Sequence, residues 1–152
     1  MKIRNFEKKD ITKILELSSR FNEVDFLGYR DAEIMDKKQF ELSQKSIETN
    51  SSNILVADLN GDFLGYLEMS KEKDYFTQKD VAYIEAIAVS SDAEGQGVGK
   101  LLLKKAEDWC VKNNCSELVL DVFSTNAKAI RFYKNAGFEE EVKKMVKTVN
   151  RQ

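Results

Sequence analysis

The stretch Tyr83–Lys100, YIEAIAVSSDAEGQGVGK, determines how the rest of the chain is interpreted. An apolar run with one carboxylate, Glu85, is followed by polar residues and then by Gly95, Gly97 and Gly99. An amphipathic segment begins directly after them, so the stretch predicts a strand, a turn and a helix with the glycines at its entrance. Unpaired N–H groups and the positive end of the helix dipole make such an entrance suitable for a phosphate.

The composition of the chain indicates a globular protein of ordinary size. It has 152 residues, of which 42% are hydrophobic and 33% are charged, and its net charge is −2. This length suffices for one core, so we expect a single domain over residues 1–152. The negative charge argues against nucleic-acid binding. Because no apolar run approaches a membrane span and the N-terminus has no signal-like segment, we expect a cytoplasmic protein without a membrane partner.

The residue types that the chain lacks restrict its chemistry. It has no histidine, which excludes Ser–His and Cys–His nucleophile pairs, an imidazole base and histidine-based zinc sites. The two cysteines, Cys110 and Cys115, suit neither a zinc knuckle nor a disulfide framework, and Cys110 lies on an apolar helix stripe that predicts packing. We therefore expect no metal, a reducing compartment, and proton transfer by other side chains or water.

Hydrophobic periodicity predicts the elements on both sides of this stretch. Strands are expected over residues 2–6, 53–59, 63–69, 81–89 and 117–123, and a final extended segment over 138–149. Asp10, Asp31 and Asn126 are good N-cap residues for three helices. These helices are expected over residues 11–21, 31–49 and 126–137, and a fourth helix runs from the glycines to about residue 113.

Turn signals predict the directions of the strands. Asn60-Gly61 is a strong hairpin signal, because both central residues of a type I′ turn need positive φ. The segment 81–123 predicts a parallel strand–helix–strand crossover. The polar residues 71–80 are expected to form a mobile connection, and Gly137 to be a left-handed residue after the last helix. The predicted order is β-α-α-β-β-β-α-β-α-β, with helices on the faces of one sheet.

Three glycine-rich motifs can be compared with the loop. A Walker loop, G-x-x-x-x-G-K-[ST], would place Glu94 at its first glycine and Leu101 at its hydroxyl residue. A dinucleotide fingerprint, G-x-G-x-x-G, would place Lys100 at its third glycine. The third motif is [RQ]-x-x-G-x-[GA]. The segment 94–99, EGQGVG, matches its two later positions and departs from it only at Glu94.

A second block of sequence supports the third motif. The pattern N-x-x-A-x-x-x-Y-x-x-x-G-F is matched in turn by Asn126, Ala129, Tyr133, Gly137 and Phe138. Over roughly residues 80–140 the chain therefore resembles the GNAT superfamily of acyl-CoA-dependent N-acetyltransferases, and its opening IRNFEKKD resembles the family's first strand and turn. The resemblance implies an α/β (α+β) single domain with a mixed, mostly antiparallel central sheet flanked by helices.

The resemblance also implies a reaction. In this family an acetyl group passes from acetyl-CoA, the cosubstrate, to a primary amine by direct attack. The backbone of the loop would hold the pyrophosphate and the backbone of the preceding strand would pair with the pantetheine arm. A strand N–H would stabilise the oxyanion. The implied cofactor-binding residues are Ile87, Ala88, Val89, Gly95, Gln96, Gly97, Val98, Gly99, Lys100, Asn126 and Tyr133.

Two side chains are candidates for proton transfer. Glu85 is the only carboxylate within the apolar strand, and regular alternation would place it on one face with Tyr83, Ile87 and Val89. The segment YIEAIAV also resembles the strand of polyamine acetyltransferases in which a glutamate is assigned as the base. Tyr133 falls at the family's position for the general acid. A solvated or lysine-paired Glu85 and a core Tyr133 are the alternatives.

The acceptor stays open at this point, between a small amine and a protein or peptide amine. Acidic residues between positions 22 and 50 are candidates for attracting a cationic amine, and scattered surface charge is the alternative: Glu23, Asp25, Asp31 and Glu33. A non-catalytic acyl-CoA-binding sensor domain is the alternative function. A nucleotide-binding ATPase is disfavoured because the Walker comparison fails. A homodimer stays open as an assembly.

Overall fold

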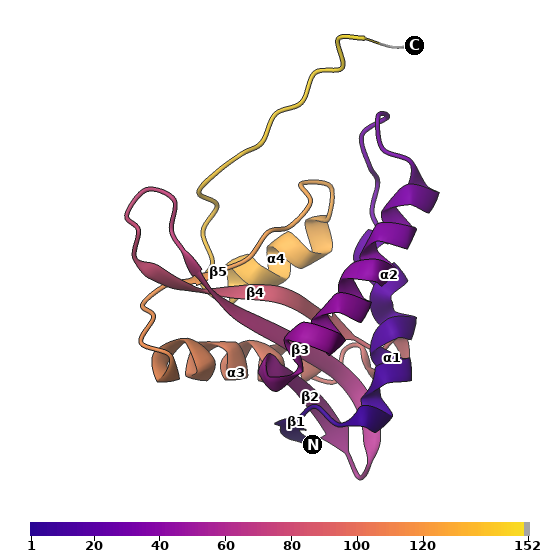
Figure 1. Cartoon of the computed structure of the whole chain (residues 1–152), viewed down its shortest axis with the longest axis vertical. Helices are drawn as coiled ribbons and strands as arrows, with labels where there is room; N and C mark the ends of the chain where they lie inside the picture. Colours follow the sequence, from indigo (N-terminus) through magenta and orange to yellow (C-terminus); the bar gives the residue numbers. More distant parts are fainter. Residues whose placement is uncertain (151–152) are drawn as a thin grey trace.

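A five-stranded sheet separates two groups of helices in the computed structural model, which describes residues 1–150 (Figure 1). Across the sheet the strands lie in the order β1 (Lys2–Asn5), β2 (Ile54–Leu59), β3 (Asp62–Lys73), β4 (Asp80–Val89) and β5 (Leu118–Val119). The first four pair antiparallel, whereas β5 runs parallel to β4. This mixed, mostly antiparallel sheet confirms the predicted fold class.

Helices cover both faces of the sheet. On one face lie α1 (Ile11–Glu16), its 3-10 continuation η2 (Leu17–Asn22) and α2 (Ala32–Thr49), and on the other lies α3 (Val98–Lys112) (Figure 1). The last helix, α4 (Ala127–Asn135), packs through Phe132 and Tyr133 against the same core cluster as α3. Short 3-10 turns precede α1, β2 and α3: η1 (Lys8–Asp10), η3 (Ser51–Asn53) and η4 (Ser91–Ala93).

Strand alternation divides the core into two clusters. On β3, Tyr66 faces the α1–α2 side, whereas its neighbours Leu67 and Met69 face α3. The predicted apolar stripe of α3 fills the second cluster, in which Leu102 is 0% and Cys110 is 5% exposed. Cys110 is therefore a packing residue, as its place on the stripe predicts.

The hairpin between β2 and β3 has the predicted turn, since Asn60 and Gly61 have φ values of 54° and 92°. The predicted mobile connection over residues 71–80 is wrong. Lys71–Lys73 extend β3 and pair with the start of β4, so only residues 74–79 connect the strands. In this turn the Asp74 carboxylate accepts the N–H of Thr77 at 2.7 Å. Apolar periodicity could not reveal these pairs, because their side chains are mostly polar.

Two predicted strands differ from those observed. β5 pairs with β4 only at Leu118 and Val119, although a strand over residues 117–123 is predicted. The final extended segment forms no strand within the described chain, and Figure 1 shows residues 139–150 running away from the body. Val142 is 77% and Met145 is 93% exposed. A strand requires a neighbour for its backbone hydrogen bonds, and the sequence of one segment does not show whether that neighbour exists.

Asp10 stands at the N-cap position of α1, as predicted, but its side chain makes no capping bond to the helix. Its buried carboxylate accepts both terminal nitrogens of Arg4, each at 2.8 Å, and the N–H of Glu7 at 2.8 Å. Burial alone would raise the pKa of Asp10, but these bonds hold it below its ordinary value. Arg4 also donates to Asp58 at 2.8 Å, so the cluster fastens β1, β2 and the start of α1 together. By contrast, Asp31 caps α2 as predicted and accepts the N–H of Ile34 at 3.0 Å.

Candidate active site

Strand β4 contains a bulge at Glu85. Ile84 pairs with Met69 of β3, and Ala86 pairs with the preceding residue of β3, Glu68, so Glu85 has no partner on that strand. An extra residue in one strand reverses the alternation of everything that follows it. The bulge therefore determines which backbone groups of β4 point to each edge of the strand and which side chains lie on each face of the sheet.

The bulge turns backbone groups of β4 away from β3. Before the bulge, the N–H of Ala82 donates to the carbonyl of Glu117, on the β5 side of the strand, at 3.0 Å. After the strand ends, the N–H of Ser90 donates to the carbonyl of Leu64 on the β3 side at 2.8 Å. Because successive N–H groups point to opposite edges, those of Ile87 and Val89 point to the β5 side. These are the two residues predicted to pair with an extended ligand.

A groove opens where β4 and β5 separate. The ladder ends at Tyr83 and Val119, and beyond it the chain after β5 diverges from β4. The groove has a volume of about 350 Å³. Its walls come from β4, the segment after β5, η2, α2, α4 and the loop between η4 and α3: Arg20, Phe21, Gln39, Ile84, Glu85, Ala86, Ile87, Ala88, Val89, Glu94, Leu120, Asp121, Val122, Phe123, Asn126, Ala129 and Tyr133.

Glu85 lies in this groove with an exposed carboxylate, which accepts the hydroxyl of Ser70 at 2.6 Å. Ser70 of β3 pairs with Tyr83 of β4, so Glu85 and Tyr83 share a face of the sheet. The expectation that Ile87 and Val89 share this face is wrong, because both pack toward the α3 cluster. The bulge is the reason, since it breaks the regular alternation on which that prediction depends.

A second carboxylate lies beneath α2 near Glu85. Glu68 is 5% exposed and accepts the hydroxyl of Ser46 and the amide of Asn50, each at 2.9 Å. Burial raises the pKa of Glu68 above its ordinary value against these two bonds, and the charge of Glu85 adds to the increase. Glu85 is therefore the exposed carboxylate at this end of the groove, and Glu68 lies buried next to it.

Helix α4 holds Tyr133 in a fixed place through its two ends. At the start, the Asn126 side chain accepts the N–H of Ala129 at 3.2 Å. At the end, Gly137 has a φ of 99°, and the N–H of Phe138 returns to the carbonyl of Tyr133 at 3.0 Å in a Schellman motif. The motif residues that carried the family resemblance therefore cap the helix and position Tyr133.

Tyr133 lines the groove with its ring packed among other aromatic rings. The centroids of Phe132 and Phe138 lie 5.5 and 5.6 Å from that of Tyr133. Burial raises the pKa of Tyr133 above its ordinary value, so the phenol stays neutral at physiological pH. Within residues 1–150 its hydroxyl has no hydrogen-bond partner. It is therefore available as a donor to a ligand in the groove.

The glycine loop fits a phosphate through its backbone. Gly95 and Gly97 have φ values of 76° and 82°, and a Cβ added to either would meet no atom within 4 Å. The first helical bond of α3 runs from the N–H of Leu101 to the carbonyl of Gly97 at 3.1 Å. The N–H groups of the first three helical residues, Val98, Gly99 and Lys100, therefore have no partner within the helix.

Two predicted loop residues have further contacts in the structure. A Cβ at Gly99 would lie 3.1 Å from the ring of Phe132, so this glycine permits the close packing of α3 on α4. The side-chain amide of Gln96 donates to the carbonyl of Asp92 at 3.0 Å, which turns it back along the chain. One donor of the Gln96 amide is thus used within the chain, whereas the backbone N–H groups of residues 98–100 have no partner within the helix.

Gly97→Ala should weaken acetyl-CoA binding by about tenfold, the effect of losing one hydrogen bond to a charged group. Its Cβ would project into the open space of the loop and strain a left-handed residue. Gly61→Ala is the matched control, because Gly61 has a φ of 92° and equally open surroundings but lies in the β2–β3 hairpin. Calorimetric titration with acetyl-CoA, beside the melting temperature of each variant, measures both effects. Equal affinity of the two variants would contradict the loop assignment.

Sequence reasoning missed several groove residues. Arg20 of η2 and Gln39 of α2 lie more than 40 residues before β4, and no motif marks them. Asp121 accepts the hydroxyl of Tyr83 across the point where β4 and β5 separate. A signal for Asp121 existed, since it is the one carboxylate in the apolar segment LVLDVF. Whether Arg20 and Gln39 reach the groove depends on how the helices that carry them cross the sheet.

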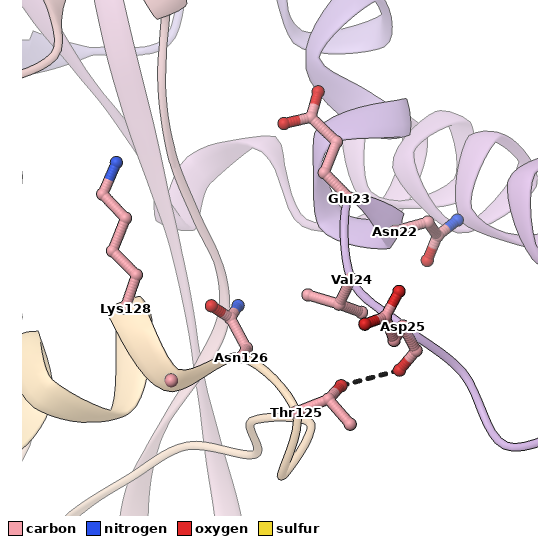
Figure 2. A pocket seen from close by; sticks show the side chains of 8 residues that line it. Asn22, Glu23, Val24, Asp25, Thr125, Asn126 and Lys128 are labelled. Carbon is pink, nitrogen blue, oxygen red and sulfur yellow. Dashed lines mark hydrogen bonds between the residues drawn. The ribbon is translucent and has the colours of Figure 1, made fainter.

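A second hollow of about 510 Å³ adjoins the groove at Asn126 (Figure 2). It lies between the loop after η2 and the start of α4. Figure 2 shows Glu23 and Lys128 on opposite sides of it, and the Thr125 hydroxyl donates to the Asp25 carbonyl at 2.6 Å. Glu23 and Asp25, two of the acids considered for amine attraction, therefore line this hollow and not the groove beside Glu85.

The structure of residues 1–150 also bears on metal binding, on membrane insertion and on the two cysteines. No group of three or more His, Cys, Asp or Glu side chains in this range is arranged to hold a metal ion. None of the helices there has the length and apolar character needed to cross a membrane. Cys110 and Cys115 are both buried with free thiols.

Comparison with known proteins identifies the class of protein that the fold and the groove define. A family model described as the acetyltransferase (GNAT) family matches residues 11–138. The chain therefore belongs to the GNAT family of acetyltransferases, and the resemblance found from the loop and the 126–138 block is confirmed.

Individual relatives agree with this assignment. An uncharacterized N-acetyltransferase of Bacillus subtilis, YhfO, is 28% identical over 93% of this chain and 91% of its own length. The solved structure of a putative acetyl transferase from Pyrococcus furiosus has a TM-score of 0.77 and 24% identity, covering 97% of this chain and 99% of that one. The aminoglycoside N-acetyltransferase AAC(6')-Iy, solved in complex with CoA, has a TM-score of 0.70 and 19% identity, covering 97% and 93%. These structures share the fold.

Proposed function

We propose that this protein transfers the acetyl group of acetyl-CoA to a primary amine by direct attack in a ternary complex. One observation carries the proposal. The groove between β4 and the segment after β5 is lined by both Glu85 and Tyr133, and it reaches Glu94, the residue before the glycine loop. The family membership and a relative solved with CoA support the same cosubstrate.

The cosubstrate would lie along the free edge of β4. The N–H groups of Ile87 and Val89 point to the groove and would donate to the amide carbonyls of the pantetheine arm, as an added strand does. The pyrophosphate would accept the N–H groups at Gly95 to Lys100 at the positive end of α3. Asn126 borders the same space, where it caps α4.

The transfer step forms a C–N bond, breaks the C–S bond and moves two protons. The nitrogen of the neutral amine attacks the thioester carbon, and the tetrahedral intermediate collapses as the C–S bond breaks. Glu85 takes the proton that the amine loses, directly or through water, and Tyr133 donates a proton or hydrogen bond to the CoA thiolate. A backbone N–H on the free edge of β4 would donate to the carbonyl oxygen while it carries negative charge.

The acceptor is a small amine or a peptide amine that carries positive charge before it reacts. The acceptor end of the groove offers the carboxylates of Glu85 and Asp121, with Glu68 buried behind them. Opposite charges in this partly enclosed space would concentrate a cationic amine. The cytoplasm is the proposed location, because two free thiols fit a reducing compartment.

A panel of amines tests the proposed function. The purified chain is incubated with acetyl-CoA and, separately, a polyamine, an amino sugar, an amino acid and a peptide with a free N-terminus. Release of free thiol and a product heavier by one acetyl group would establish the reaction and its acceptor class. Binding of acetyl-CoA without thiol release with any amine would instead indicate the sensor function.

A further inference from the structure

An ion-pair cluster stands at the start of the glycine loop. The guanidinium of Arg20, from η2, donates to the carboxylate of Glu94 through one terminal nitrogen. Its other terminal nitrogen donates to the carbonyl of Val89 at 2.7 Å. The ammonium of Lys128, from α4, lies 3.4 Å from the second oxygen of Glu94. Three elements far apart in the chain therefore bring two cations to one carboxylate.

Arg20 lies between the end of β4 and the start of the glycine loop, the two parts of the chain that the proposed cosubstrate would contact. Val89 ends β4, and its carbonyl faces the groove because the bulge has turned that edge toward β5. Glu94 immediately precedes Gly95, the first glycine of the loop. Arg20, Val89 and Glu94 all line the groove. An extended ligand that runs along β4 and ends at the helix entrance must pass this guanidinium.

Position 94 carries a negative charge next to the proposed phosphate site. The GNAT motif has Arg or Gln at this place, whereas this chain has a carboxylate next to the backbone donors for a pyrophosphate. The hydrogen bond and the charge of Arg20, with that of Lys128, lower the pKa of Glu94, so it is ionised at neutral pH. An unpaired carboxylate here would repel a phosphate.

We infer that Arg20 is the phosphate-binding cation of this loop, in place of the side chain that the motif has at position 94, and that Glu94 moderates its charge. A guanidinium has five N–H donors, and the bonds to Val89 and Glu94 leave donors for phosphate oxygens. Glu23 also pairs with Arg20, 3.7 Å from its Nε, so Arg20, Lys128, Glu94 and Glu23 together have a net charge of about 0. Removing Glu94's charge therefore strengthens phosphate binding, and removing that of Arg20 weakens it.

This inference rests on the proposed function, since it assumes that the groove binds an acyl-CoA. Two ligands distinguish the two ideas: acetyl-CoA and S-acetylpantetheine, which has the same thioester arm but no phosphate. Arg20→Met should weaken acetyl-CoA binding about tenfold, the effect of one charge-assisted hydrogen bond. It should leave S-acetylpantetheine binding within about twofold. Glu94→Gln, which keeps an acceptor oxygen for Arg20, should tighten acetyl-CoA binding about threefold.

The control variant is Lys13→Met, which removes one positive charge from α1 at an exposed pair with Glu16. It should leave both affinities unchanged. Arg20→Lys retains the charge and should recover part of the acetyl-CoA affinity, which separates charge from loss of folding. Calorimetry at two salt concentrations measures these constants, because the Arg20 contribution should shrink as salt rises.

These measurements distinguish a failure of the inference about Arg20 from a failure of the proposed function. If the wild-type chain binds acetyl-CoA and Arg20→Met binds it equally well, the inference is wrong and the proposed function stands. Equal losses for acetyl-CoA and S-acetylpantetheine would also overturn it, since Arg20 would then only hold the edge of β4 through Val89. Weaker acetyl-CoA binding by Glu94→Gln would show that Glu94 does not moderate the site. If the wild-type chain binds neither ligand, the proposed function itself fails.

Discussion

Glu85→Gln should lower kcat/KM for an amine acceptor by about 10²–10⁴-fold near neutral pH, the range for loss of a general base. The reason is the scarcity of reactive amine. An alkylamine with a pKa near 10.4 is neutral in only about one molecule in a thousand at pH 7. Without a base in the groove, the variant reacts only with that fraction. Its rate should rise about tenfold for each pH unit, so the deficit shrinks as pH approaches the amine pKa.

The measurement is the pH profile of kcat/KM by thiol release, with Glu72→Gln as the matched control. The Ser70 hydroxyl lies 3.2 Å from Glu72 and 2.6 Å from Glu85, so both carboxylates belong to one surface patch. Only Glu85 lines the groove. Glu72→Gln should keep the wild-type profile within about twofold. If Glu85→Gln gives a profile of unchanged shape, Glu85 binds the acceptor without acting as its base.

The parts of the site that local chemistry determines could be predicted from the sequence. Asn126 and Gly137 cap α4 because an amide side chain and a left-handed residue suit helix ends wherever the helix lies. The same holds for Gly95 and Gly97, whose positive φ values need no contact with distant residues. The pattern of the 126–138 block was therefore a reliable guide to the fold and to the place of Tyr133.

The parts that depend on pairing between distant segments could not be predicted. YIEAIAV is consistent with a regular strand, and only its register with β3 shows that Glu85 is the extra residue. That one residue reverses the faces of Ile87 and Val89 and directs their backbone groups to the groove. Arg20 depends in the same way on the crossing of η2 over β4. Each feature depends on contact between two segments that are distant in the sequence, and no sequence motif indicates that contact.

Tyr133→Phe should slow acetyl transfer by about 10²–10⁴-fold while leaving the dissociation constant of acetyl-CoA nearly unchanged. The substitution removes only the hydroxyl, which has no hydrogen-bond partner within residues 1–150. The ring contacts with Phe132 and Phe138 persist, so the fold and the groove should be preserved. The loss should therefore appear in kcat, because a donor to the leaving thiolate acts in the transition state.

The pH dependence of this variant distinguishes an acid from a base. Because burial raises the pKa of Tyr133, the wild-type phenol is protonated throughout the neutral range and donates equally well at each pH there. The Tyr133→Phe deficit should be constant between about pH 6 and 9, unlike that of Glu85→Gln. Tyr75→Phe removes the same hydroxyl from a side chain that is 83% exposed, and it should change nothing. If Tyr133→Phe retains wild-type kcat, the thiolate takes its proton from water, and Tyr133 serves only to pack α4.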